Sequence, residues 1–492
     1  MSIDACSARA RTTVQGTVLA LLVICAACSR KSTPERLVGA SSAAAKGSAH
    51  VSASPRARLA CKPSGTSFSL GPVDEQSTEE EGDQPLPQDL PFAVTVGFAV
   101  AHPNGYAVTA VDARPGGSHS VLALLDKDVS RGTILDLGRV YGDAEPPRVV
   151  IRGEEGFVVV PDTDASGHSY RYGWVRGLNS SPRVDWLGSF EQSVDESPVY
   201  GLASTPETIT FAWDELDRAS RISRVRWASF DTSGRPIVIS TKSPLGSNKP
   251  SHEPKWTIHT TEQGVDAESP ELVSHGAGYW LSFLASETEK PRPAAGGTTP
   301  KVADAKDDDV RAIDLGRRGV WLVPLDMRGV QSGKPIVITS RGARVISYDL
   351  AVTSDGGAVV AYRDADATPG VEEQVIEVVR VRPDGGLVRH RIDDERVGAG
   401  TPSLLVDYEV DNGARSVWIS VAGSSGETKL AELATGSAPT LDIVEEPSLA
   451  GAEPMLRRGN ALLVARHRAR LVGFERTDCT WPDAQTGAPK LP

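Results

Sequence analysis

The sequence predicts an all-β protein, a β-propeller of seven four-stranded blades, with six or eight blades as alternatives. Short runs of Val, Ile, Leu and Tyr alternate with turn residues among 47 Gly and 34 Pro, and helix signals are poor. The clearest unit is Ser269–Leu284 (SPELVSHGAGYWLSFL): a Ser-Pro start, a strand, a Gly turn and a second strand. Weaker copies of this unit recur from about residue 92 to residue 476, which indicates a repeat architecture.

Prolines mark the start of most of these units. A base interval of about 50 residues fits one four-stranded blade, and two longer intervals predict insertions at 242–268 and 285–317. The first insertion is expected to connect blades three and four, and the second to lie inside blade four. The prolines are Pro147, Pro198, Pro270, Pro402 and Pro454, with Tyr348 at the equivalent position of the remaining unit. The predicted blades are 92–140, 147–190, 198–241, 270–340, 348–395, 402–445 and 454–476.

A second internal match supports the repeat. Gly234–Ser240 (GRPIVIS) and Gly333–Thr339 (GKPIVIT) are nearly identical, and each follows a strand-like run that ends in a turn. We expect both segments to be outer strands of their blades.

The last predicted blade contains only three strand candidates. An open edge strand would expose unpaired backbone groups, so the ring needs a fourth strand from elsewhere. Ser67–Leu70 can supply it, so that both ends of the domain build blade seven. Antiparallel strand order then places Cys61 and Cys479 on the same face, and a disulfide between them would replace the missing turn.

The N-terminus carries a secretory signal. Arg9 and Arg11 precede an apolar run, Thr17–Ile24, and the segment ends in Cys25-Ala26-Ala27-Cys28. Small residues before Cys28 resemble the lipobox of bacterial lipoproteins. The resemblance implies that Cys28 is lipidated and becomes the mature N-terminus, and that Ser29 allows sorting to an outer membrane. Cys25 stands where the family usually has Leu, and cleavage as an ordinary signal is the alternative.

These features divide the chain into a signal peptide (1–27), a flexible tether (28–60), the propeller (61–481) and a C-terminal tail (482–492). An oxidising compartment favours the pairing of Cys61 with Cys479. The net charge of -12 argues against a nucleic-acid partner. We expect a monomer that meets the membrane through its lipid anchor.

Acidic residues recur in the predicted connections between second and third strands. All of these connections fall on the face opposite the tether, and we predict that this acidic face binds a protein or basic ligand. The alternative is that the charges serve solubility. The residues are Asp112, Asp162, Asp164, Asp214, Glu215, Asp217, Asp364 and Asp366.

Metal and catalytic motifs are absent. Asp162–Gly167 (DTDASG) resembles the start of a calcium loop, but the expected later carboxylate is missing, so we predict no metal. We also expect no cofactor. Neither G-x-S-x-G nor H-E-x-x-H occurs, and no catalytic residues are predicted.

The sequence therefore predicts a non-enzymatic, lipid-anchored cell-envelope module that binds or scaffolds a partner. In this it resembles propeller-containing bacterial lipoproteins in general. The alternative is an extracytoplasmic hydrolase or lyase that acts on glycans through carboxylates at the mouth of the central channel. Clustering of Asp and Glu with a basic or aromatic group there favours the enzyme, and a featureless centre favours the binding module.

Overall fold

The computed structural model describes most of the propeller and none of the residues before Leu59. The described ranges contain 28 strands and one short 3-10 helix, Pro447–Leu449. No helix within them is long and apolar enough to cross a bilayer. The ranges are 59–71, 94–114, 117–140, 144–164, 167–192, 199–217, 222–238, 257–262, 265–287, 318–340, 343–364, 375–392, 401–407, 417–423, 427–433, 441, 443–468 and 471–481.

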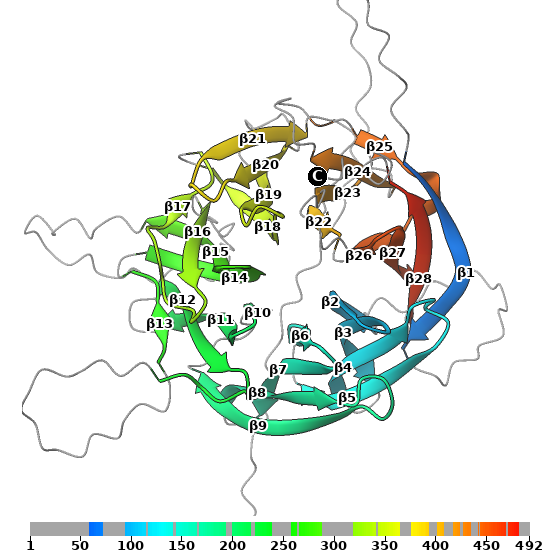
Figure 1. The fold of residues 1–492 in the computed structure, drawn as a ribbon, viewed down its shortest axis with the longest axis horizontal. Coiled ribbons are helices and arrows are strands. Elements are labelled where there is room, and N and C mark those ends of the chain that lie inside the picture. Colours follow the sequence, from blue (N-terminus) through cyan, green and yellow to red (C-terminus); the bar gives the residue numbers. More distant parts are fainter. Residues whose placement is uncertain are drawn as a thin grey trace, which may run out of the picture. The chain divides into compact units, whose positions relative to one another are not determined.

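The strands form seven four-stranded antiparallel blades arranged in a ring, which confirms the predicted seven-bladed propeller (Figure 1). Each innermost strand contacts the innermost strand of the next blade, and the last contacts the first, so the ring is closed. From the centre outwards, blade one consists of β2 (Val94–His102), β3 (Gly105–Arg114), β4 (Gly117–Asp126) and β5 (Gly132–Val140), and blade two of β6 (Arg148–Arg152), β7 (Glu155–Asp164), β8 (Gly167–Arg176) and β9 (Arg183–Gln192). Blade three consists of β10 (Tyr200–Ser204), β11 (Thr208–Asp217), β12 (Ile222–Asp231) and β13 (His259–Thr260). Blade four consists of β14 (Val265–His275), β15 (Gly278–Glu287), β16 (Gly319–Asp326) and β17 (Ile336–Val337).

Blades five to seven continue the ring. Blade five consists of β18 (Val345–Val352), β19 (Ala358–Asp364), β20 (Val375–Val381) and β21 (Leu387–Ile392). Blade six consists of β22 (Ser403–Val406), β23 (Val417–Ala422), β24 (Thr428–Leu433) and β25 (Ile443–Glu445). Blade seven consists of β26 (Glu453–Arg458), β27 (Ala461–Arg468), β28 (Leu471–Thr480) and β1 (Ala60–Leu70).

The hydrophobic core lies between the blades. Successive side chains of a strand point to opposite faces, so each middle strand packs on both neighbouring blades. In β7, Val159 packs against Phe211 of blade three, whereas Val158 and Val160 pack with Leu122 of blade one. Burial of both faces explains why the middle strands are continuous apolar runs instead of alternating ones.

Three tryptophans tie consecutive blades together. Each buries its ring between two blades and donates its indole N–H to a carbonyl oxygen in a turn of the following blade. Because the interior offers no water to replace these bonds, they help to set the angle between blades. The pairs are Trp174 with Ser233 (3.1 Å), Trp227 with Gly329 (2.8 Å) and Trp280 with Gly356 (3.0 Å).

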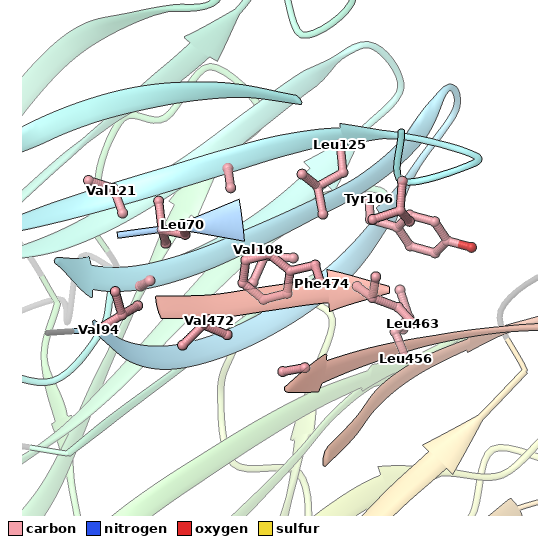
Figure 2. Close-up of a cluster of buried hydrophobic side chains, with 14 residues drawn as sticks. Leu70, Val94, Tyr106, Val108, Val121, Leu125, Leu456, Leu463, Val472 and Phe474 are labelled. Atoms are coloured by element: carbon pink, nitrogen blue, oxygen red, sulfur yellow. The ribbon is translucent and has the colours of Figure 1, made fainter. Parts of the chain in front are cut away.

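Blade seven is closed from both ends of the domain, as predicted. β1 pairs with β28, and Leu70 packs with Phe474 and Val108 in a cluster that joins blades seven and one (Figure 2). The disulfide between Cys61 and Cys479 is present. Its position differs from the prediction, because β1 begins at Ala60 and β28 continues to Thr480, so the two cysteines are directly paired inside the strands. The bond is therefore a cross-strand link and does not replace a turn.

The outer strand of blade three also differs from the prediction. The segment around Pro236 makes only the first contacts of this strand, where Ile237 N donates to Ser229 O (2.8 Å). β13 then completes the strand by pairing with Trp227. The insertion, which includes 239–256 outside the described residues, thus interrupts the outer strand and is not the 242–268 connection that we expected. A strand split between two segments has no continuous sequence pattern.

Candidate functional site

The predicted acidic residues lie at one end of the second strands of four blades. Asp112 lies in β3, Asp162 in β7, and Asp214 and Glu215 in β11; Asp364 is the last residue of β19. Asp164 and Asp217 are the last residues of β7 and β11, but their side chains are not described, and Asp366 lies outside the described residues. These strand ends share the face on which the innermost strands begin.

Several of these carboxylates make internal contacts. Asp214 accepts hydrogen bonds from Val199 N (3.0 Å) and Ser269 N (2.9 Å) and so joins blades three and four. Asp364 accepts one from Arg344 N (2.9 Å).

Two more of them form ion pairs, Asp162 with Arg171 (2.8 Å) and Glu215 with Arg226 (3.0 Å). Binding of a partner by the acidic face stays a prediction. In the described part of the chain, no three His, Cys, Asp or Glu side chains are grouped to hold a metal ion.

A second charged group lies at the centre of the ring. Arg148 is the first residue of β6, Glu271 lies in β14 and Asp349 in β18, all innermost strands. Arg148 interacts electrostatically with both acids although blade two is not adjacent to blade four or five. Figure 1 shows β6, β14 and β18 around the centre of the ring, so these interactions act across the ring centre.

A β-bulge positions Glu271. The register of β14 shifts between Glu268 and Glu271, and Ser269 adopts a positive φ of 53°. Ser269 is held on both sides, because its N–H binds Asp214 of blade three and its carbonyl oxygen accepts a hydrogen bond from Tyr348 Oη (2.5 Å) of blade five. Positive φ is costly for a residue with a side chain and persists only where neighbours enforce it, often at functional sites.

The neighbouring strand leaves room for this bulge. β10 carries Gly201 next to Glu271, and a Cβ on Gly201 would lie 2.9 Å from Leu272 N. A side chain there would push the two innermost strands apart.

Asp349 is held by backbone amides. Its Oδ2 accepts a hydrogen bond from Leu404 N (2.5 Å) of blade six, and its Oδ1 accepts one from Leu350 N (2.8 Å). Burial raises the pKa of Asp349 to about 6, while the two amides and Arg148 oppose the rise. The carboxyl group is therefore mostly ionised at pH 7.

The pKa of Glu271 is raised further than that of Asp349. Burial raises the pKa of Glu271 well above its ordinary value, and the nearby charge of Asp349 raises it further, whereas Arg148 and the Leu350 amide lower it. The same Leu350 amide acts on both acids, so the two carboxyl groups lie close together. Burial thus favours the protonated form at both carboxyl groups of the ring centre, and more strongly at Glu271 than at Asp349.

Aromatic rings surround the cation. The guanidinium carbon of Arg148 lies 3.0 Å from the centroid of the Phe98 ring and 5.8 Å from that of Tyr200. Phe98 lies in the bulge of β2 and is 40% exposed. Tyr200 is buried, and its hydroxyl donates to Pro146 O (2.6 Å), two residues before Arg148.

The two tyrosine hydroxyls are not acids at neutral pH. Burial raises the pKa of both Tyr200 and Tyr348 well above the ordinary value. Each hydroxyl donates to a carbonyl oxygen of another blade, so the tyrosines hold the strands that carry the charged residues.

Sequence analysis missed this central cluster. Arg148 and Glu271 directly follow prolines at the predicted starts of repeat units, and Asp349 follows Tyr348 at the equivalent position. A charged residue at the same repeat position in three units was the signal that could have predicted the cluster. This position faces the axis in these blades.

No protein family matches this sequence, and neither does any curated protein sequence. Among solved structures, the polysaccharide lyase Uly1 aligns with a TM-score of 0.47 at 11% identity, over 82% of this chain and 94% of that one. The β-propeller domain of the Trilobed protease from Pyrococcus furiosus aligns with a TM-score of 0.41 at 8% identity, over 80% and 98%. The α-L-arabinofuranosidase Arb93A from Fusarium graminearum aligns with a TM-score of 0.38 at 9% identity, over 67% and 91%. The activities of these proteins do not transfer to this chain at such low similarity.

Proposed function

We propose that this protein is an extracytoplasmic enzyme that cleaves glycans at the centre of the propeller ring. The observation that carries the proposal is the pair Glu271 and Asp349, whose environments push their pKa values apart beside Arg148. This clustering of acids with a basic and an aromatic group supports the enzyme over a binding or scaffolding module. Lipidation of Cys28 and an outer-membrane location remain part of the proposal.

Hydrolysis of a glycosidic bond commonly uses two carboxyl groups, one protonated and one ionised. Protonated Glu271 donates its proton to the glycosidic oxygen as the bond from that oxygen to the anomeric carbon breaks. Because the two carboxyl groups lie close together, ionised Asp349 forms the new bond to the same carbon, with no water between the two acids. Water then replaces Asp349 at this carbon and gives a proton to Glu271, so both groups return to their starting states. A lyase would instead break the bond by elimination and leave an unsaturated sugar.

A panel of purified polysaccharides tests the proposal. We expect the mature wild-type protein to release new reducing ends from at least one of them, and ultraviolet absorbance of the product distinguishes a lyase from a hydrolase. Glu271→Gln should lower this rate about 100-fold to 10,000-fold, because the amide cannot donate the proton. Glu453→Gln, an exposed change on the innermost strand β26, should leave the rate unchanged. Equal rates for wild type and Glu271→Gln would show that another group performs the chemistry.

The pH dependence of this activity follows from the two acids. A carboxylate nucleophile acts only when ionised, so kcat/KM should rise with pH and reach half of its plateau near the Asp349 pKa of about 6. At higher pH the rate should fall as Glu271 loses its proton. The two apparent pKa values belong to the coupled pair and not to one residue alone. The measurement is kcat/KM between about pH 4 and pH 9. A rate that is highest below pH 5 would contradict the assignment of Asp349 as the ionised nucleophile.

A further inference from the structure

Arg148 has an unusual environment for a charged side chain. Its guanidinium packs on Phe98, yet within the described ranges it makes no hydrogen bond and no ion pair within 4.0 Å. Other arginines of the propeller are paired with carboxylates. Examples are Arg171 with Asp162 (2.8 Å), Arg226 with Glu215 (3.0 Å), Arg380 with Asp355 (2.9 Å) and Arg466 with Glu475 (2.8 Å).

The acids near Arg148 do not compensate its charge. Burial lowers the pKa of Arg148 even though Tyr200, Glu271, Glu145 and Asp349 all act to raise it. Asp349 already accepts two backbone hydrogen bonds, and burial opposes the ionisation of Glu271. A desolvated cation without a close counter-charge is unfavourable and gains most from an anionic partner.

The geometry suits recognition by the guanidinium. Phe98 and Tyr200 lie against Arg148, so its orientation is set before a ligand arrives and little side-chain entropy remains to be lost. A planar guanidinium presents two parallel N–H donors that match the two oxygens of a carboxylate. Arg148 itself is half-buried, so part of its side chain is still exposed to solvent.

We propose that Arg148 binds a carboxylate of the ligand, so that the glycan contains acidic sugars such as uronic acids. This inference rests on the proposed function, because it names the substrate class of the same site. The ligand carboxylate forms an ion pair with Arg148, and the sugar ring lies toward Glu271 and Asp349. A sulfate ester would offer related oxygens without the planar match.

The test is equilibrium binding of two matched probes, methyl glucuronide and neutral methyl glucoside, to the full mature protein. We expect wild type to bind the glucuronide at least about tenfold more tightly, as one charge-assisted pair allows. Arg148→Gln should abolish the preference for the glucuronide. Arg148→Lys should keep part of this preference, because the positive charge remains but the two parallel N–H donors of the guanidinium are lost. Arg183→Gln, at a side chain that is 70% exposed, is the matched control and should keep the full preference.

Three outcomes would overturn the inference. These are equal affinity for both probes, no glucuronide binding up to about 10 mM, and tighter binding of a sulfated methyl glucoside than of the glucuronide. Circular dichroism of Arg148→Gln and Arg148→Lys shows whether each variant is folded.

Failure of this inference is distinguishable from failure of the proposed function. Glu271→Gln should bind the glucuronide as wild type does, so binding is read without catalysis. Cleavage of neutral glycans through Glu271 without a preference for the acidic probe would overturn the acidic-sugar inference alone. Binding through Arg148 without cleavage of any glycan would overturn the proposed enzyme alone.

Discussion

Replacement of Glu271 with Gln is expected to make the folded protein more stable at neutral pH while it removes the activity. Wild-type Glu271 must keep its proton at the ring centre, where burial and Asp349 oppose its ionisation. The unfolded chain releases that proton near the ordinary pKa of 4.5. Gln has the shape of the protonated acid but does not titrate, so the variant avoids the cost of holding the proton.

The sign of the effect follows from proton linkage. Between pH 4.5 and the raised pKa of Glu271, the folded state binds more protons than the unfolded state. The free energy of unfolding of the wild type therefore falls as pH rises through this window, by up to about 1.4 kcal/mol per pH unit. Below pH 4.5 both states are protonated and the stability contribution of the neutral acid is fully present. The variant should match the wild type there and exceed it increasingly at higher pH.

Urea unfolding at several values between about pH 4 and pH 8 measures this difference. Glu453→Gln is the matched control, because Glu453 is an exposed side chain on β26 and should give a small difference at every pH. A difference for Glu271→Gln that does not change with pH would contradict the raised pKa. Loss of activity together with a gain in stability would mark Glu271 as a residue that is retained for function at a cost in stability.

Removal of the disulfide is expected to lower the free energy of unfolding by about 2 to 5 kcal/mol. The bond joins residues 418 positions apart and cross-links β1 to β28 at the ring closure. Without it, β1 is held in blade seven only by its backbone pairing and by the side chains around Leu70 and Phe474 (Figure 2). A lost outer strand would also expose the edge of β28, a site for pairing between molecules.

The variant is Cys61→Ser combined with Cys479→Ser, which leaves no free thiol at the closure. Chemical denaturation compares it with wild type, with wild type in reducing agent, and with Ser69→Ala, an exposed change on β1. The double variant and the reduced wild type should unfold at the same denaturant concentration, and Ser69→Ala should resemble the wild type. An unchanged midpoint for the double variant would show that packing alone closes the ring. Non-reducing peptide mapping of the mature protein checks the bond and also reads the N-terminus and any lipid on Cys28.

The sequence by itself determined the architecture. Repeated strand pairs, blade-starting prolines and the Gly234–Ser240 match with Gly333–Thr339 predicted seven blades, because each blade is a local unit whose strands follow one another along the chain. The sequence also predicted, from the need to pair the open edge of the last blade, that Ser67–Leu70 completes blade seven, and from its cysteines that Cys61 pairs with Cys479. It failed at the outer strand of blade three, where an insertion separates Pro236 from β13 and no continuous pattern exists.

Only the tertiary structure decided the candidate site. Arg148, Glu271 and Asp349 belong to three different blades, and no local motif connects them. Their chemistry arises when closure of the ring brings β6, β14 and β18 to one axis. Burial there raises the pKa of both carboxyl groups, more strongly at Glu271, and no carboxylate of the described residues lies within 4.0 Å of the Arg148 guanidinium. Desolvation and long-range charge interactions depend on distances across the ring, and those distances are a property of the closed fold.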